Sequence, residues 1–299
     1  MTTAPCNVAS PSSRLVEEEA QRFARERSAH YLEGETKSGA IGAPYLLYRP
    51  EARTGVLLVH GLMAAPEEVR EWAEALYAQG YTVYAPRMAG HGTSAEDLAG
   101  RSAGEWLASV ERGHEILRGC CEQVVAAGFS TGGAVVLHSV IDQPQAFAAV
   151  ISVSAPLRFR KFSAHFARPL SLWNRVFQAL GIERLRKPFV TNHADNPHIN
   201  YLRCPVHSIA QIQHLMGDVR RGLPSIRIPA LIVHGDHDPK VDVRGARELY
   251  RRLGSPHKRY REVASDRHGI VRGEVGQHVF AEVAAFLAEV APAGAARAT

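Results

Sequence analysis

Long hydrophobic runs are missing from this 299-residue sequence, and no apolar stretch approaches the roughly 20 residues that a membrane-spanning helix needs. The first 30 residues lack the apolar core of a signal peptide and carry three consecutive glutamates at 17–19. Cysteine is scarce, with four residues in all, and the sequence contains no C-x-x-C pair of the kind found in many zinc and redox sites. These absences predict a reduced, cytoplasmic protein.

Nucleic-acid-binding patterns of the RNP or zinc-finger type are also absent, although the net charge is +5 and the isoelectric point is near 9.1. The positive charge is concentrated between residues 155 and 225, where 11 Lys and Arg face 3 Asp and Glu, a net charge of +8. The remainder of the chain is therefore at −3. We predict no nucleic-acid partner. The basic segment is either a solvated face or a surface that contacts an anionic lipid or a negatively charged substrate.

Short apolar runs alternate with segments of helical periodicity from residue 44 onward. The run at 56–59 is uninterrupted, which is typical of a strand buried on both faces of a parallel sheet. We therefore predict an α/β fold with a mostly parallel sheet flanked by helices. The predicted strands are 45–48, 56–59, 81–85, 123–129, 148–153, 230–233 and 259–263. The predicted helices are 14–30, 66–79, 103–118, 131–141, 242–253 and 274–289.

One interval breaks this alternation. Between Ser154 and Ile228 more than seventy residues show helical spacing and no clear strand, and an unstructured loop of that length would be unusual. The pattern predicts a helical cap inserted into the sheet domain, with Pro169 interrupting any single helix there. The predicted division is an N-terminal extension at 1–43, a core at 44–155 and 227–292, a cap at 156–226 and a flexible tail at 293–299.

A G-x-S-x-G pattern lies between a predicted strand and a predicted helix, at residues 128–132 with Ser130 at its centre. This strand–turn–helix setting is the one in which a nucleophilic serine stands on a sharp, strained turn. Side chains at the two glycine positions would block the close approach of strand and helix. The pattern therefore predicts Ser130 as a nucleophile, and the alternative is a glycine-rich turn whose serine caps the helix.

A serine nucleophile needs a base, and the base needs an acid to orient it. In this fold class the chain order is serine, acid, histidine, with the acid and the histidine after late strands. His268 follows the predicted strand 259–263, and both Asp236 and Asp238 follow the strand 230–233. The carboxyl ends of parallel strands meet at one edge of the sheet, so we expect these side chains to converge. From the residues alone, the acid is either Asp236 or Asp238.

The loop after the predicted strand 230–233 also contains a cluster of side-chain types that bind metals: His234, Asp236, His237 and Asp238. Four side chains in one tight loop rarely converge on a single ion. We predict no metal site.

The turn His60-Gly61-Leu62 follows the strand 56–59 and can aim the backbone N–H of Leu62 at the space above Ser130. Together with the N–H of Thr131 it would form an oxyanion hole, in which each donor is typically worth about 3–4 kcal/mol.

Seven segments of the chain, spread over residues 45–290, resemble the α/β-hydrolase family, and in particular bacterial carboxylesterases and monoacylglycerol lipases. The segments are VLLVHGLMAAPEEV at 56–69, YTVYAPRMAGHGTSAEDL at 81–98, EWLASVERGHEIL at 105–117, GFSTGG at 128–133, NYLRCPVHSIAQIQHLMGDVRRGLPSI at 200–226, LIVHGDHDPKVD at 231–242 and SDRHGIVRGE at 265–274. The resemblance implies the α/β-hydrolase fold, and it implies Asp238 as the acid, because the family's acid stands three residues after the loop glycine. It also implies Leu62 and Thr131 as the oxyanion donors.

These observations predict a serine hydrolase that cleaves carboxylic esters through an acyl-enzyme, with Ser130, Asp238 and His268 as its triad and with no metal or organic cofactor. Its partner is a small acyl ester, with possible peripheral contact to an anionic lipid surface. Aromatic residues of the cap are expected to line the acyl side of the pocket: Phe159, Phe162, Trp173 and Phe177.

Two alternatives remain open. The same triad could transfer the acyl group to an acceptor other than water, or act as a perhydrolase. The chain could also be a lipid-binding module without catalysis.

Overall fold

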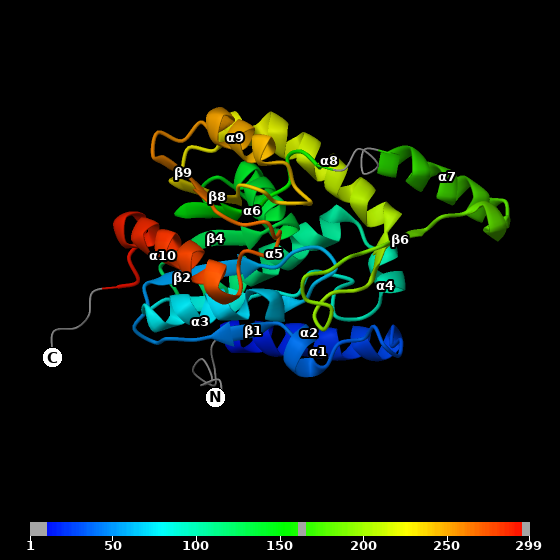
Figure 1. Ribbon diagram of the computed structural model, residues 1–299. Helices are drawn as coiled ribbons and strands as arrows, with labels where there is room; N and C mark the ends of the chain where they lie inside the picture. The colour runs from blue at the N-terminus through cyan, green and yellow to red at the C-terminus, as the bar shows by residue number, and fades with distance from the viewer. Residues whose placement is uncertain (1–10, 161–165, 295–299) are drawn as a thin grey trace.

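The computed structural model describes residues 11–160 and 166–294 and is built around a seven-stranded sheet (Figure 1). The strand order is β1-β3-β2-β4-β5-β8-β9, with β1 antiparallel to β3 and the other neighbours parallel. The strands are β1 (Tyr45–Leu47), β2 (Thr54–Val59), β3 (Thr82–Ala85), β4 (Gln123–Phe129), β5 (Ala149–Val153), β8 (Ala230–Gly235) and β9 (Lys258–Val263). The mostly parallel sheet and all seven of its predicted strands are confirmed.

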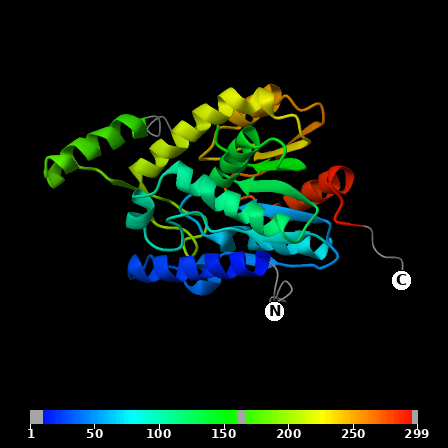
Figure 2. The ribbon, with the colours of Figure 1, turned by 180° about the vertical axis from the view of Figure 1, so that it is seen from behind.

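Helices cover both faces of the sheet (Figures 1 and 2). Along β2, Val56 and Leu58 pack into the hydrophobic cluster of one face, whereas Leu57 and Val59 pack into the cluster of the other. Because side chains of a strand alternate between faces, a sheet covered on both sides requires the uninterrupted apolar run seen in the sequence. One face carries α3 (Arg70–Ala78) and α10 (Gly273–Val290), and the other carries α5 (Ala103–Arg118), α6 (Thr131–Asp142), α8 (Val206–Gly222) and α9 (Val243–Arg252).

The predicted helix at 14–30 is α1 (Pro11–Ala29), which lies beside α5 on the outside of the core (Figures 1 and 2). A short 3-10 turn, η1 (Pro66–Val69), precedes α3 and begins with a proline, which suits a first helical position. Two short helices, α2 (Gly39–Gly42) and α4 (Ala95–Ala99), were not expected from the sequence. Helices of four and five residues carry too little periodicity to be recognised.

The described part of the cap interval 156–226 adds no strand to the main sheet. It contains α7 (Ala167–Ala179) and α8, together with the 3-10 turns η3 (Glu183–Leu185) and η4 (Leu223–Ser225). The expectation of no strand there is wrong, because β6 (Phe189–Thr191) pairs with β7 (Arg203–Pro205) in a separate antiparallel ladder. Each of these strands has only three residues, too few to show alternation. Pro169 lies in the first turn of α7, where its missing N–H removes no helical hydrogen bond.

The segment after α10 is held to the sheet where the sequence predicted a flexible tail. The carbonyl of Ala293 accepts hydrogen bonds from the backbone N–H groups of Arg53 (2.8 Å) and Thr54 (3.3 Å). Ala293 is therefore bonded to the sheet, and residues 295–299 of the predicted tail lie outside the described residues. None of the helices in the described ranges is both long enough and apolar enough to cross a membrane.

Candidate active site

Ser130 occupies the turn between β4 and α6 with φ 52° and ψ −121°. A positive φ at a residue with a side chain stores roughly 1–3 kcal/mol of strain. The flanking glycines make this turn possible. A Cβ atom at Gly132 would lie 2.2 Å from the Val59 carbonyl oxygen, and one at Gly128 would lie 2.4 Å from the carbonyl carbon of Gly132. No other residue type fits either position, so the glycines of the motif have a steric cause.

Ser130, His268 and Asp238 form a continuous hydrogen-bonded chain. The Oγ atom of Ser130 lies 2.8 Å from Nε2 of His268, and Nδ1 of His268 lies 2.6 Å from Oδ2 of Asp238. The three side chains come from the ends of β4, β8 and β9, which meet at the carboxyl edge of the sheet. His268 also packs against the ring of Phe129, with 5.1 Å between ring centroids.

The environment of Asp238 suits an ionised carboxylate that orients a histidine. Its Oδ1 atom accepts hydrogen bonds from the backbone N–H groups of Lys240 (2.8 Å) and Val241 (3.0 Å). Burial raises the pKa of Asp238, but the hydrogen bond and charge of His268 and the two N–H donors outweigh this, so its pKa lies below the ordinary value. The carboxyl therefore stays ionised while it holds the imidazole.

Asp236, the other acid that the sequence left open, points elsewhere. Its Oδ1 atom accepts a hydrogen bond from the backbone N–H of Ser265 at 2.9 Å, which ties the two loops together. The exposed His237 lies beside Asp236 (3.1 Å) and the buried His234 lies nearer Asp238 (3.7 Å), so the side chains of this loop form two separate pairs. Among the described residues no three His, Cys, Asp or Glu side chains are placed to hold a metal ion.

The turn after β2 carries the predicted oxyanion donor Leu62. His60 is fully buried, with Nδ1 2.9 Å from the Gly61 carbonyl oxygen and Nε2 accepting a hydrogen bond from the Met88 N–H at 3.3 Å. Burial lowers the pKa of His60 to about 4, so the ring is neutral and its Nδ1–H donates to Gly61. This bond fixes the peptide between Gly61 and Leu62, and with it the direction of the Leu62 N–H.

Thr131 is the first residue of α6, so its N–H has no acceptor within the helix. Both Leu62 and Thr131 line the cavity above Ser130.

Glu68, which the sequence did not single out, is part of the same site. Its Oε2 atom accepts a hydrogen bond from the Gly61 N–H at 2.7 Å, and its side chain lines the cavity although the residue is only 6% exposed. Burial raises the pKa of Glu68, and the Gly61 N–H and nearby positive charge only partly offset this. One signal was available. Glu68 lies four residues before the fully buried Trp72, on the apolar side of the predicted helix.

A cavity of about 250 Å³ opens above Ser130 and His268 and has two kinds of wall. The apolar residues on it include Leu62, Met63, Phe159, Val190, Ile209 and Ile212. The polar residues on it include Glu68, Asn192, His193, Asp195, Asn200 and Lys240. The Asp195 carboxylate also accepts a hydrogen bond from the Gly269 N–H at 3.0 Å, which joins the cap to the histidine loop.

Of the four aromatic residues expected in the pocket, Phe159 lines the cavity and Phe162 lies outside the described residues. The prediction was wrong for Trp173 and Phe177, which do not line the cavity as the described residues form it. Their rings pack on each other, with centroids 4.4 Å apart, and the Trp173 Nε1–H donates to the Leu185 carbonyl at 2.9 Å. They hold η3 against α7, a helix that projects from the body of the molecule (Figure 1).

The sequence matches one protein family model and is similar to two bacterial ester-cleaving proteins. The family described as "Serine aminopeptidase, S33" matches residues 50–275. The chain is similar to the thermostable monoacylglycerol lipase of Bacillus sp. (strain H-257), with 31% identity over 211 residues that cover 71% of this chain and 81% of that protein. It is also similar to the carboxylesterase of Bacillus subtilis (strain 168), with 24% identity over 235 residues that cover 78% of this chain and 91% of that one.

Solved structures share the fold. One comes from work on LipS and LipT, two metagenome-derived lipolytic enzymes, with a TM-score of 0.72 and 23% identity, covering 86% of this chain and 98% of that chain. Another is the Paleococcus ferrophilus monoacylglycerol lipase, with a TM-score of 0.68 and 21% identity, covering 82% of this chain and 97% of that chain. With the sheet, the serine elbow and a family match over residues 50–275, the chain belongs to the S33 family of α/β hydrolases.

Proposed function

We propose that this protein is a serine hydrolase that cleaves carboxylic esters through an acyl-enzyme intermediate. The observation that carries the proposal is the hydrogen-bonded chain from Ser130 Oγ to His268 Nε2 (2.8 Å) and from His268 Nδ1 to Asp238 Oδ2 (2.6 Å) at the floor of a cavity. A serine with a base and an oriented acid in this geometry is equipped for nucleophilic attack on a carbonyl carbon. The similarity to a monoacylglycerol lipase and a carboxylesterase supports ester substrates.

In the first half-reaction, His268 takes the Ser130 hydroxyl proton on Nε2 as the oxygen attacks the ester carbonyl. The carbonyl oxygen becomes an oxyanion, which accepts hydrogen bonds from the backbone N–H groups of Leu62 and Thr131. Asp238 stabilises the imidazolium without taking its proton. When the carbon–oxygen bond to the alcohol breaks, His268 gives that proton to the leaving alkoxide, and an acyl-serine remains.

In the second half-reaction, a water molecule replaces the alcohol. His268 removes one proton from the water, and the hydroxide attacks the acyl carbon. Collapse of the second tetrahedral intermediate breaks the bond to Ser130 Oγ, which takes the proton back from His268. The free carboxylic acid leaves, and the triad returns to its starting state.

The two kinds of cavity wall suit an ester with an apolar acyl group and a hydroxyl-bearing alcohol. Apolar side chains such as Phe159, Val190 and Ile212 can cover a hydrocarbon chain. Polar side chains such as Asn200 and Lys240 can hydrogen-bond the hydroxyls of a small alcohol. We therefore propose monoacylglycerol-like esters as the substrate class.

Labelling with a fluorophosphonate probe tests the proposal directly, with Ser130→Ala as the matched control. We expect the probe to modify the wild-type protein at Ser130 and to leave Ser130→Ala unmodified, because the reagent needs an activated serine. Turnover of an acyl-ester series would then define the chain length, and product analysis with added alcohol or peroxide would separate hydrolysis from acyl transfer or perhydrolysis. An unlabelled wild-type protein would contradict the mechanism.

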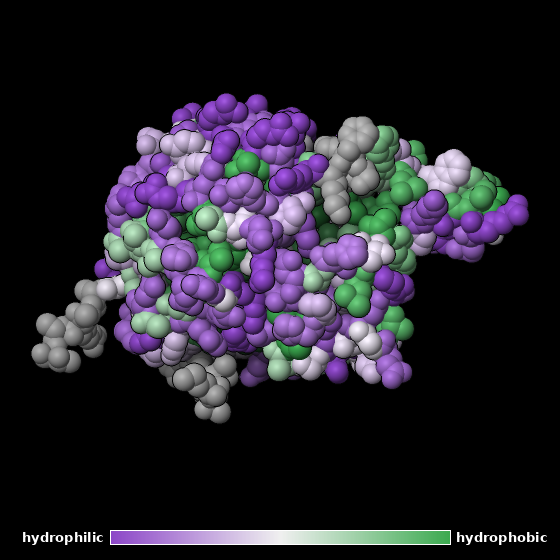
Figure 3. Space-filling model, in the orientation of Figure 1, coloured by the Kyte–Doolittle hydropathy of each residue, from purple (hydrophilic) through white to green (hydrophobic). Residues whose placement is uncertain are grey.

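We also propose that α7 contacts an anionic lipid surface. Leu172, Val176 and Leu180 recur every four residues on α7 and its C-cap and are 48–63% exposed, whereas Ser171 and Asn174 are buried. Figure 3 displays this hydrophobic surface on the projecting helix. The flanking exposed cations are Arg168, Arg175, Arg184 and Lys187. An apolar stripe bordered by cations is the composition of helices that lie in a lipid interface.

Vesicle flotation tests this contact. We expect binding to vesicles that contain phosphatidylglycerol, weaker binding as salt rises from about 50 to about 500 mM, and little binding to pure phosphatidylcholine. The double substitution Leu172→Ser and Val176→Ser should remove binding without changing turnover of a soluble ester. Leu202→Ser, at a residue that is 57% exposed but lies outside α7, is the matched control. Equal binding by all variants would argue against the contact.

A further inference from the structure

A segment that precedes the family match contacts the elements that surround the cavity. The family match begins at residue 50, whereas residues 31–43, here called the strap, connect α1 to β1. The strap contacts the oxyanion turn (61–65), the loop before α4 (90–95) and the return segment of the cap (199–203). These three segments are far apart in the chain, so their relative placement depends on contacts of this kind.

Two charged residues of the strap make the polar contacts. Lys37 is 8% exposed, and its Nζ atom donates to the Asn200 carbonyl at 3.1 Å while its backbone N–H donates to the Gly92 carbonyl at 3.1 Å. Glu35 accepts from Arg203 Nε at 2.7 Å and from the Ala95 N–H at 2.9 Å. Each residue therefore joins the return segment of the cap to the loop before α4.

An apolar contact joins the same segments at the oxyanion turn. Ile41 of the strap packs into a small cluster with Ile199 of the cap and with Ala64 and Ala65, which follow Leu62 and Met63. Ile199 and both alanines are fully buried. Ile41 of the strap thus packs where Ile199 of the cap meets the oxyanion turn.

From the return segment, the contacts continue into the active site. The Tyr201 N–H donates to the Met63 carbonyl at 2.9 Å, and Met63 has a strained backbone with φ 63°. Asn200 and Glu68 line the same cavity, and Glu68 holds the Gly61 N–H. The segment that Lys37 and Glu35 hold is therefore bonded directly to the oxyanion turn, through Tyr201 and Met63.

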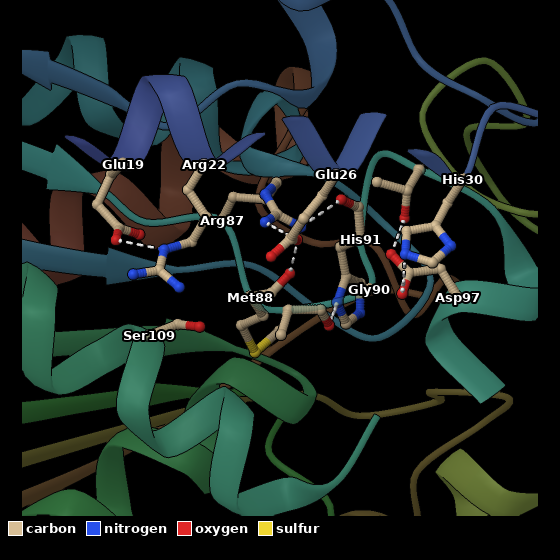
Figure 4. A network of polar contacts seen from close by, with 12 residues as sticks. Glu19, Arg22, Glu26, His30, Arg87, Met88, Gly90, His91, Asp97 and Ser109 are labelled. Carbon is tan, nitrogen blue, oxygen red and sulfur yellow. Dashed lines mark hydrogen bonds and ion pairs between the residues drawn. The ribbon is translucent and has the colours of Figure 1, made fainter. Parts of the chain in front are cut away.

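The helix α1, which leads into the strap, is held to the core by polar contacts (Figure 4). Glu26 forms an ion pair with the buried Arg87, and His30 lies 3.6 Å from Asp97. Arg27 Nε donates to the Lys37 carbonyl at 2.8 Å, which connects the helix directly to the strap. These contacts fix one end of the strap to the core of the protein.

We propose that the strap is a specificity element that holds the return segment of the cap against the oxyanion turn and so positions the polar wall of the cavity for the alcohol part of the substrate. Lys37 and Glu35 are its positioning residues. Lys37 bonds the backbone of the cavity residue Asn200, and Glu35 bonds Arg203 in the same segment. This inference rests on the proposed ester hydrolysis for its kinetic readout only. Its structural readout is independent of the chemistry.

The test compares Lys37→Met and Glu35→Gln with Glu33→Gln, an exposed strap residue, as the matched control. Two esters with the same acyl chain are used, a monoacylglycerol and a p-nitrophenyl ester, which has no hydroxyl on its leaving group. Loss of one charged hydrogen bond predicts a roughly tenfold higher KM for the monoacylglycerol. We expect little change in kcat, and little change in either constant for the p-nitrophenyl ester or for Glu33→Gln.

Hydrogen exchange of the same variants supplies the structural readout. We expect faster exchange of the backbone amides at 199–203 in Lys37→Met and Glu35→Gln, with unchanged exchange in β4 and α6. A double-mutant cycle of Glu35→Gln with Arg203→Gln should be non-additive in this exchange. Unchanged exchange together with unchanged KM would overturn the proposal, as would equal losses with both esters. If the wild-type protein cleaved neither ester, the proposed function would be refuted but the proposal for the strap would not, because hydrogen exchange tests the strap without catalysis.

Discussion

The floor of the cavity and the projecting helix α7 of the cap are built in opposite ways. On the floor, His268 and Asp238 are buried and hydrogen-bonded, and Ser130 is fixed by a turn that only flanking glycines permit. On the cap, α7 turns Leu172, Val176 and Leu180 outward, and none of its residues lines the cavity as the described residues form it. The difference separates the catalytic groups, which the sheet positions, from the exposed face of α7, which we propose contacts lipid. Substitutions on the floor should therefore change kcat, and those on α7 should change the response to a lipid surface.

Removal of the nucleophile should produce the largest effect. Ser130→Ala is expected to lower kcat by about 10⁶, the loss seen when a triad nucleophile is deleted. The fold should remain, because alanine keeps the Cβ atom and so bears the same strain at positive φ as serine. Steady-state kinetics and circular dichroism on the purified variant check both statements. Near-normal hydrolysis would mean that another group is the nucleophile.

The two acids of the β8 loop offer a matched pair. Asp238→Asn should lower kcat by about 10⁴, because an amide favours the wrong tautomer of the histidine. Asp236→Asn should cost far less, since Asp236 bonds the Ser265 N–H and lies beside His237 rather than His268. Parallel kinetics on the two variants decide between them. A reversed order of penalties would assign the acid to Asp236.

Two tryptophans allow the contributions of the core and of α7 to stability to be compared. Trp106 on α5 is fully buried, whereas Trp173 on α7 is 49% exposed. Trp106→Ala should lower the free energy of unfolding by about 3–5 kcal/mol, because it removes a large side chain from a close-packed core. Trp173→Ala should lower it by less than about 1 kcal/mol, in line with ordinary surface substitutions. Urea denaturation of both variants measures the contrast, and similar losses would show that α7 is part of the core.

On the acid side of the pH profile of kcat/KM, uptake of a single proton should end activity. The pKa of Asp238 lies below its ordinary value, so this carboxylate stays ionised as the pH falls and does not itself end activity. Protonation of the base alone should then end activity, so the logarithmic profile of kcat/KM should fall with a slope near one on the acid side. A slope near two would mean that the Asp238 carboxylate is protonated as well.

The sheet and the serine elbow could be predicted because both depend on neighbours in the chain. Burial on two faces requires continuous apolar runs such as Val56–Val59, and the turn at Ser130 requires glycine at Gly128 and Gly132. Other features escaped prediction because they depend on packing. Glu68 is an acidic residue of a type usually exposed on helices, yet it lies buried at the oxyanion turn. Trp173 and Phe177 are aromatic residues of the type that often lines substrate pockets, yet they pack on each other away from the cavity.

The sequence by itself determined the order of the catalytic residues along the chain: a nucleophile turn, two candidate acids after a late strand, and a histidine after the last strand. The family resemblance implied Asp238 as the acid, but local pattern could not choose it, because Asp236 and Asp238 stand two residues apart in one loop. The tertiary structure shows that the Asp238 side chain points to His268 and the Asp236 side chain points to Ser265. It also decided that the strap reaches Asn200 through Lys37, a contact between residues 163 positions apart. Periodicity reports the burial of local segments, whereas contacts across such separations arise only when the packed segments meet.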